Sequence, residues 1–437
     1  MRVGSGWLKH KKCKYLSVSA YKKFHEPNLL TMTEKERLTE HSVAGSTFMM
    51  PKEEMLEIRR KGKKIRIGIP SDKDKVEYRV PLTPQAVELL VSYGHDILIE
   101  KEAGKAASYS DEEYLAAGAV VMADRKEIFE CDIILRVSPF DESEIDLLKG
   151  HQALISDLQI NAHCPNSIGK LMQKKMTNIA YEYMEDEDGR KPIVQLMSQI
   201  SGSTSVVLIN EYMSKSRGGK GVLLGSVTGI SPTELVILGS GTAAEFAARA
   251  ALGMGAIVKV FDESISSLRK LEEKLPQRIF TSLYYPKVVQ KALKSADAVL
   301  GAMPVSMPPP FRISEDMVKK MKPGSVIIDL NVSQGGCFET TRCTDLNNPS
   351  YVEHGVIHYC VPNLAAIVSR TASIALSNVL IPILIAIGEI GGIDNYIKNS
   401  KSFRKGVYVY NGILTNSNLS EKFNIPYKDI DLLLSVY

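Results

Sequence analysis

Residues 234–244 read Glu-Leu-Val-Ile-Leu-Gly-Ser-Gly-Thr-Ala-Ala, and this stretch decides the fold. The apolar run before the first glycine predicts a short buried parallel strand, and the G-x-G-x-x-A turn opens an Ala-rich helix. Gly239 permits the tight turn, and Gly241 lets the backbone approach a pyrophosphate at the positive end of the helix. Ala244 replaces the usual third glycine, and its methyl group still allows close packing of helix on strand. The stretch therefore predicts the start of a dinucleotide-binding unit.

The residues that follow complete this unit. Ile257 to Phe261 predict a second strand, which ends at Asp262, 23 residues after Gly239. A carboxylate at this offset accepts a hydrogen bond from a ribose hydroxyl and repels a 2′-phosphate. We therefore expect NAD rather than NADP, with Ser240 and Asp262 in the cofactor site; a solvated acid at the strand end is the alternative for Asp262.

Composition narrows the class of protein. The chain has 437 residues, 44% of them apolar and 24% charged, which is enough for two or three domains with proper cores. The net charge is only +4 and much of the basic excess lies in the first 25 residues, so nucleic-acid binding is not expected. The six scattered cysteines form no C-x-x-C pair, which favours reduced thiols in a cytoplasmic protein without a metal site.

Alternation of strands and helices predicts the domain organisation. Residues 1–64 form a basic lead-in, for which we expect disorder or a wrongly assigned start. Strands and helices then alternate, which predicts a second parallel α/β unit before the dinucleotide-binding one. We expect an α/β protein with two Rossmann-like, doubly wound parallel-sheet domains joined by long helices. The substrate domain would comprise residues 65–200 plus 371–437, and the NAD-binding domain residues 201–370.

Long apolar helices are expected at Ile193 to Lys215 and at Thr371 to Ile390. The most apolar region, Ala375 to Ile393, contains polar residues and a proline and is barely long enough to span a bilayer. We therefore expect a buried helix between domains rather than a membrane segment.

Several motifs occur in the order found in one enzyme family. They are Glu77-x-Arg79-Val80, Met197 to Gly202, the glycine turn, Gln334 to Glu339 and Tyr359 to Asn363. From about Ile65 to Tyr437 the chain resembles alanine dehydrogenase and the related soluble nucleotide-binding subunit of proton-translocating transhydrogenase. The resemblance implies oxidative deamination of alanine to pyruvate and ammonia, with hydride passing to NAD, in a cytoplasmic homo-oligomer that is commonly a hexamer. Transhydrogenase subunits deliver hydride to a membrane partner, so the absence of an expected membrane segment favours the dehydrogenase.

The resemblance also implies roles for individual residues. Arg79 stands where the family has an arginine, and a guanidinium is suited to hold a substrate carboxylate by two hydrogen bonds. A surface ion pair with Glu77 is the alternative. Ser198, Gln334 and Asn363 are expected to bind the cofactor, with the loop after Ser333 beside the nicotinamide.

Four positions depart from the family pattern. The chain has Arg136 in place of lysine, Gln159 in place of the acid/base histidine, Ser333 in place of aspartate and Gln199 in place of glutamate. Arg136 retains the capacity to bind a carboxylate, but it does not lose a proton at ordinary pH. Glutamine does not titrate and serine is a poor base unaided.

Loss of a general base typically costs a factor of about 10²–10⁴ in rate. We therefore expect Arg79, Arg136, Gln159 and Ser333 to occupy the catalytic positions of a slow alanine dehydrogenase or of an enzyme with a changed substrate. His163 is the nearest replacement base, against a merely solvated loop histidine. A non-catalytic NAD(H)-binding relative and a related reductive amination of a 2-oxo acid remain as alternatives.

Overall fold

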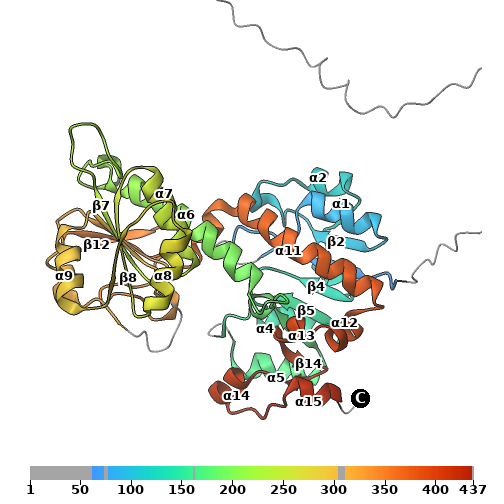
Figure 1. The fold of residues 1–437 in the computed structure, drawn as a ribbon. Coiled ribbons are helices and arrows are strands. Elements are labelled where there is room, and N and C mark those ends of the chain that lie inside the picture. The colour runs from blue at the N-terminus through green and yellow to red at the C-terminus, as the bar shows by residue number, and fades with distance from the viewer. Residues whose placement is uncertain (1–61, 73–76, 161–162, 304–310, 436–437) are drawn as a thin grey trace, which may run out of the picture. The chain divides into compact units, whose positions relative to one another are not determined.

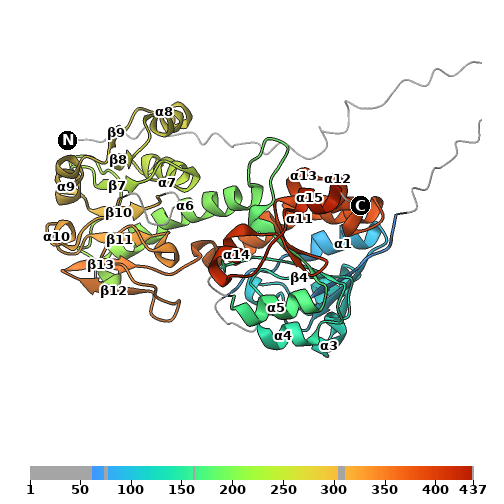
Figure 2. The ribbon, with the colours of Figure 1, turned by 90° about the horizontal axis from the view of Figure 1, so that it is seen from below.

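The computed structural model describes residues 62–72, 77–160, 163–303 and 311–435. These residues belong to one compact unit that extends from Arg59 to Tyr437. They form two separate β-sheets with flanking helices, shown in two views in Figures 1 and 2. The expectation for residues 1–64 falls almost entirely outside the described residues.

The first sheet has eight strands in the order β15-β14-β6-β5-β4-β1-β2-β3. Neighbours from β3 to β6 run parallel, whereas β14 is antiparallel to both β6 and β15. The strands are β1 (Arg66–Ile69), β2 (Asp96–Glu100), β3 (Val120–Met122), β4 (Ile133–Leu135), β5 (Ala153–Ser156), β6 (Thr177–Ala180), β14 (Val407–Tyr410) and β15 (Ile413–Leu414). The associated helices are α1 (Pro84–Ser92), α2 (Asp111–Ala116), α3 (Arg125–Ile128), α4 (Glu142–Leu147) and α5 (Pro165–Gln173).

The second sheet has seven strands in the order β12-β13-β11-β10-β7-β8-β9, and only β12 is antiparallel to its neighbour. The strands are β7 (Glu234–Leu238), β8 (Ile257–Asp262), β9 (Phe280–Leu283), β10 (Ala298–Gly301), β11 (Val326–Asp329), β12 (Ser350–Glu353) and β13 (Val356–Tyr359). The associated helices are α7 (Thr242–Gly253), α8 (Ile265–Lys274), α9 (Pro286–Ser295) and α10 (Glu315–Val318).

The strand orders explain why both sheets are doubly wound. In the second sheet the chain builds outward from β7 to β9 and then resumes on the other side of β7 with β10. The first sheet repeats this pattern, with β1 to β3 on one side and β4 to β6 on the other. Successive residues of β7 enter different buried clusters, Leu235 and Ile237 on one face and Val236 and Leu238 on the other. A continuous apolar strand buried on both faces is typical of such a sheet. The predicted fold class is confirmed; the exact domain boundaries stay a prediction.

Local sequence signals explain where helix α1 starts. The Thr83 side chain accepts a hydrogen bond from the backbone N–H of Ala86, and Pro84 occupies the first position of α1. Proline suits this position because its missing N–H would have no partner there. The start of α1 is therefore set by Thr83 and Pro84.

Both predicted long helices are present, as α6 (Pro192–Met213) and α11 (Ser369–Glu389). Helix α6 packs against α7 and α11, and α11 also contacts α1. Gly202 permits the closest approach of α6 to α7, since an added Cβ would lie 2.2 Å from the carbonyl oxygen of Ala243. Among the described residues, Pro192–Met213 and Leu364–Glu389 are long and apolar enough to span a membrane, but core helices of soluble proteins pass the same test.

Helix α11 buries Leu376, Leu380 and Leu384. Its buried hydroxyls also hold the loop before α1, because Ser373 accepts from the N–H of Val80 and Ser377 from that of Thr83, both at 2.9 Å. This late helix therefore helps to position a loop near the start of the ordered chain. The remaining helices are α12 (Ile393–Asn399), α13 (Lys401–Arg404), α14 (Ser417–Phe423) and α15 (Ile430–Ser435).

We predict that Gly202→Ala destabilises the protein by about 1–3 kcal/mol, the usual cost of forcing an extra methyl group into a packed interface. Thermal or urea unfolding measures the loss. Gly169→Ala is the matched control, because Gly169 also lies inside a helix but its added Cβ meets nothing within 4 Å. Equal stability of the two variants would contradict the close approach of α6 and α7.

Candidate functional site

The glycine turn after β7 has the geometry of a phosphate cradle. Gly239 has φ +103°, and an added Cβ would lie 2.1 Å from the carbonyl oxygen of Ala302, so the fold itself requires glycine. An added Cβ on Gly241 meets nothing within 4 Å. Helix α7 begins directly after Gly241 without a side-chain cap. Its first N–H groups thus lack a side-chain cap, and an anionic group binds favourably at such a helix start.

Ala244 is fully buried within the core beneath α7, as expected for a residue that packs helix on strand. Asp262 ends β8 and is only 5% exposed. Its Oδ2 accepts hydrogen bonds from the N–H and the Oγ of Ser240, each at 2.8 Å, and its Oδ1 accepts from the N–H of Ser264. A carboxylate has about four acceptor positions. Asp262 therefore stabilises the glycine turn through these hydrogen bonds. Its contact with a ribose stays a prediction.

The other expected cofactor residues lie on three different elements. Ser333 and Gln334 belong to a short 3₁₀ turn after β11, and both are exposed. Asn363 follows β13 with φ +57°, and its Nδ2 donates to Oε2 of Glu77 at 3.1 Å. Ser198 is half-buried on α6. Asn363 thus connects the end of a strand in the second sheet to the loop that carries Arg79.

Arg79 forms a buried, bidentate ion pair. Its Nε and Nη2 donate to the two carboxylate oxygens of Glu77, each at 2.7 Å, and the side chains are 5% and 8% exposed. The remaining Nη1 points to the sulfur of Met197 at 3.4 Å. The alternative of a surface ion pair is wrong, since the pair exists but is buried. Burial disfavours the charged form, yet Glu77 outweighs it and raises the pKa of Arg79.

Arg136 has a partner for every guanidinium nitrogen. Nε donates to the carbonyl of Ser138 at 3.1 Å, Nη1 to Glu144 at 2.6 Å and Nη2 to the carbonyl of Pro139. The guanidinium carbon also lies 4.3 Å from the ring centroid of Phe140. These contacts make Arg136 a support for its own loop, and its contact with a substrate carboxylate stays a prediction.

Arg79 and Arg136 nevertheless line one small cavity of about 70 Å³, together with Asp72, Glu77 and Val137. The cavity lies between the segments that follow β1 and β4, where the strand order of the first sheet reverses. Ligands of open α/β sheets bind at this point. Burial raises the pKa of Asp72, against the opposing effect of Arg136.

Gln159 is exposed, with φ +38°, and its Nε2 donates to Oδ2 of Asp157 at 2.9 Å. His163 is 7% exposed rather than solvated, which overturns the alternative of a solvated loop histidine. Neither of its ring nitrogens has a hydrogen-bond partner among the described residues. Burial lowers the pKa of His163 and favours a neutral ring.

Sequence reasoning assigned no role to Asp157 and Glu182, which lie after neighbouring strands. Oε1 of Glu182 accepts from the N–H of Leu158 at 2.8 Å. Burial, followed by the charge of Asp157, raises the pKa of Glu182 to about 9. The available signal was positional, since each acid comes within two residues of a strand end at the ligand-binding edge.

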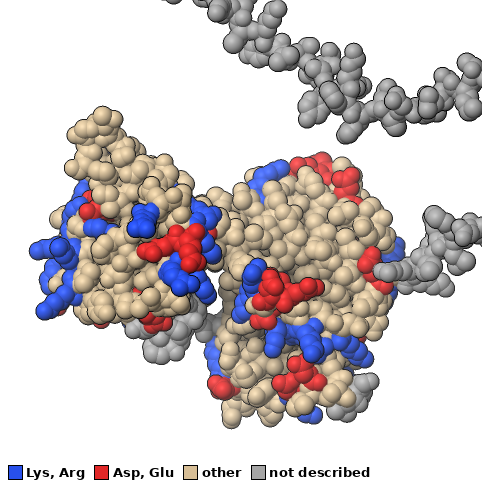
Figure 3. Space-filling model, in the orientation of Figure 1, with Lys and Arg blue, Asp and Glu red and all other residues tan. Residues whose placement is uncertain are grey.

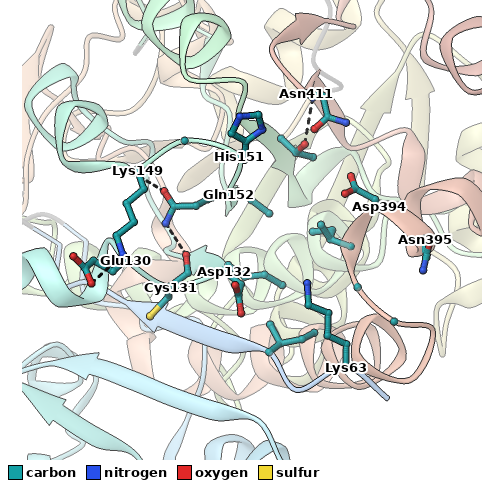
Figure 4. Close-up of a pocket in the computed structure, with 18 residues that line it drawn as sticks. Lys63, Glu130, Cys131, Asp132, Lys149, His151, Gln152, Asp394, Asn395 and Asn411 are labelled. Carbon is teal, nitrogen blue, oxygen red and sulfur yellow. Dashed lines mark hydrogen bonds and ion pairs between the residues drawn. The ribbon is translucent and has the colours of Figure 1, made fainter. Parts of the chain in front are cut away.

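A larger cavity lies elsewhere (Figure 4). It measures about 420 Å³ and is lined by residues before the strands of the first sheet, including Lys63, Asp132, Lys149 and His151. Lys149 pairs with Glu130 at 3.1 Å. We assign the reaction to the smaller cavity, because the large one lies at the amino ends of β1, β4 and β5.

Other classes of site receive no support from the described residues. None of their His, Cys, Asp and Glu side chains form a group of three or more suited to a metal ion. On the face shown in Figure 3, acidic and basic side chains are interspersed instead of forming one extended basic area.

The chain is similar to known proteins over most of its length. The family model described as "Alanine dehydrogenase/PNT, N-terminal domain" matches residues 68–201, and the corresponding C-terminal domain matches residues 205–417. An alanine dehydrogenase of Methanococcus maripaludis is 38% identical over 84% of this chain and 99% of its own length. Alanine dehydrogenase 2 of Staphylococcus aureus is 34% identical over 85% of this chain and 100% of its own length.

The chain is also similar to solved structures. One titled L-alanine dehydrogenase has a TM-score of 0.76 and 33% identity, and the match covers 82% of this chain and 99% of that one. A transhydrogenase from Sinorhizobium meliloti has a TM-score of 0.67 and 21% identity, covering 80% of this chain and 99% of that one, which shows the shared fold.

We predict that Gly241→Asp weakens NADH binding at least about tenfold more than Gly241→Asn, because only the aspartate places a negative charge beside the pyrophosphate. Both residues are good helix caps, so both variants should fold. Fluorescence titration with NADH measures the two dissociation constants. Equal affinities of the two variants would place the pyrophosphate away from this turn.

Proposed function

Because the chain belongs to the alanine dehydrogenase/PNT family, we propose that it is an NAD-dependent oxidoreductase that converts L-alanine, NAD⁺ and water into pyruvate, ammonia and NADH, or performs the same reaction on a close 2-amino acid. The observation that carries the proposal is the buried Arg79, held by Glu77 beside the cavity where the first sheet reverses. We further propose that residues 65–200 plus 371–437 form the substrate domain and residues 201–370 the cofactor domain.

The cofactor site suits NAD. Gly239, Gly241 and the start of α7 would hold the pyrophosphate, Ala244 keeps that helix close to the sheet, and Asp262 would accept from a ribose. NAD, when bound, supplies the hydride acceptor of the reaction. The exposed Gln334 and Asn363 and the half-buried Ser198 would surround the nicotinamide end.

Arg79 has donors left for a substrate. A guanidinium has five N–H groups, and the hydrogen bonds to Glu77 and Met197 use three of them. Two donors remain for a carboxylate, and Glu77 fixes the plane of the guanidinium before the substrate arrives. Orientation of this kind lowers the entropic cost of reaching the reactive geometry.

Proton transfer is the altered part of the reaction. Hydrolysis of the imine requires a group that accepts a proton from water, and neither Gln159 nor Ser333 is suited to that task. This observation favours a second candidate function, a non-catalytic NAD(H)-binding protein. A third candidate, reductive amination of another 2-oxo acid, uses the same carboxylate site.

We predict that the protein oxidises NADH when given ammonia and pyruvate or a related 2-oxo acid. Arg79→Ala should lower kcat/KM for the oxo acid at least about 30-fold. The variant removes the guanidinium that would pair with the substrate carboxylate, and truncation of one partner of a buried charge pair costs roughly 2–5 kcal/mol. Steady-state assays across a panel of oxo acids measure this.

Two controls accompany the assay. Arg217→Ala removes an arginine that pairs with Glu211 at an exposed position, and it should leave turnover unchanged. NADH affinity should be similar in all three proteins. If the unaltered protein binds NADH but turns over no oxo acid, the binding-only candidate replaces the enzyme.

We also propose that the protein is a cytoplasmic homo-oligomer, with the hexamer as the expected size. Exposed apolar side chains on the two long helices support this, because Val207 of α6 is 68% exposed and Ile374 of α11 is 45% exposed. Light scattering should give a multiple of the 48.2 kDa chain mass. Val207→Asp should reduce that mass, whereas a monomeric mass for the unaltered protein would contradict the proposal.

A further inference from the structure

Asp157 and Glu182 lie together at the edge of the first sheet. Strands β5 and β6 run parallel with Ser156 opposite Ala180, so the residues after them emerge side by side. The N–H of Asp157 donates to the carbonyl of Val137 at 3.0 Å, and Tyr181 Oη donates to the same oxygen at 2.8 Å. Val137 also lines the cavity of Arg79, and the charge of Asp157 acts on Arg79, so these two segments lie beside that cavity.

Glu182 has an unsatisfied oxygen. Its Oε1 accepts from the N–H of Leu158, whereas its buried Oε2 has no hydrogen-bond partner among the described residues. A buried polar atom without a partner is costly, and an ionised carboxylate cannot donate a hydrogen bond. A proton on Oε2 would resolve this, because the neutral acid could donate to the nearby Asp157. Burial, together with the charge of Asp157, favours this neutral form of Glu182 by raising its pKa.

Gln159 completes the arrangement. Its amide donates to Oδ2 of Asp157 at 2.9 Å, from the position where the resembling family has a histidine. The glutamine therefore orients Asp157 through a hydrogen bond, although it does not titrate. Asp157 is therefore in direct contact with the altered position.

We propose that Asp157 is the catalytic residue that transfers protons in this chain, and that Glu182 is a positioning residue that shares its proton. This inference rests on the proposed deamination of a 2-amino acid. It assigns the task of the missing histidine to a pair of carboxyl groups.

The proton balance is as follows. After hydride has left the substrate carbon, water forms a C–O bond to that carbon, the C=N π electrons move to nitrogen, and the proton lost by water passes to Asp157. The pair then protonates the nitrogen. Ammonia leaves with the electrons of the C–N bond, the C=O bond forms, and the hydroxyl proton returns to Asp157. Release of this proton to solvent restores the starting state.

The charged and titratable groups around Asp157 and Glu182 do not themselves exchange a proton near neutral pH. Arg79 is charged and attracts Asp157. Burial raises the pKa of each neighbouring tyrosine, which keeps them neutral, and lowers the pKa of His163. The neighbouring tyrosines are Tyr181, Tyr183 and Tyr408.

The pair is tested first without substrate or cofactor. At neutral pH the infrared spectrum of the unaltered protein should contain a carboxylic-acid carbonyl band that Glu182→Gln removes. Glu187→Gln, the same change at a nearby exposed position, should leave the band unchanged. Spectra that are identical for the unaltered protein and Glu182→Gln would overturn the shared proton.

Unfolding gives a second readout of the same proton. The raised pKa of Glu182 means that its neutral form is favoured in the folded state, so this contribution to stability is complete below about pH 4.5 and declines up to about pH 9. The thermal midpoint of the unaltered protein should therefore fall more steeply between these pH values than that of Glu182→Gln. Parallel curves would count against the pair.

Kinetics test the catalytic assignment. Asp157→Asn should lower kcat by a factor of about 10² or more with NADH affinity unchanged, the usual effect of losing a general base. Glu182→Gln should shift the pH profile of kcat. Loss of kcat in His163→Gln with Asp157→Asn unaffected would overturn the assignment in favour of the histidine.

The two levels of proposal fail differently. If the unaltered protein has no turnover, the proposed function fails, and the infrared and unfolding measurements still decide whether the pair shares a proton. If the unaltered protein turns over and Asp157→Asn is equally active, the catalytic role of Asp157 fails while the proposed function stands.

Discussion

The buried ion pair of Arg79 with Glu77 is the interaction on which the site depends. Burying two charges is costly unless their geometry is good and their other donors and acceptors are used. Here the pair is bidentate, Met197 approaches the third nitrogen and Asn363 donates to Glu77, while two N–H groups of Arg79 remain for the proposed substrate. Asn363 thus donates to a carboxylate that lies 286 positions earlier in the chain. The pair holds a positive charge at a fixed place in the fold, which is what recognition of a carboxylate requires.

Both sheets place their chemistry at the same topological point. Each is built outward from its first strand and then resumes on the other side, so a gap opens beyond the strand ends at the reversal. In the second sheet that point carries the glycine turn, and in the first it carries the cavity of Arg79. Asn363 hydrogen-bonds to Glu77 between these two parts of the chain. Repetition of one strand order therefore gives the chain two such edges, and the proposed function assigns one to each reactant.

This chain differs from the pattern of the alanine dehydrogenase family in the residues for proton transfer more than in those for binding. The residues proposed for substrate and cofactor binding are present: Arg79 is buried in its pair with Glu77, Gly239 forms the tight turn, and Asp262 accepts hydrogen bonds from Ser240. The residues for proton transfer are not retained, because Gln159 does not titrate and Ser333 is a poor base unaided. Arg136 illustrates a second kind of change, because it holds Glu144 and the carbonyls of its own loop instead of extending into open space. A longer, permanently charged side chain can be accommodated there only by such internal pairing.

The sequence alone determined what depends on neighbouring residues: the strand, glycine turn and helix at 234–253, the cap of α1, the two long helices and the doubly wound fold class. Periodicity, caps and glycine turns act over a few residues, and they are therefore legible without a structure. Only the tertiary structure decided what depends on distant segments. In the folded protein the Arg79 ion pair and His163 are buried, and the guanidinium of Arg136 is paired with Glu144. Asp157 lies near Glu182, which is 25 positions away in the chain. Burial arises when strands far apart in the chain align, and no local pattern specifies it: the pairing of Glu77 with Arg79 could be expected from the sequence, but its burial could not.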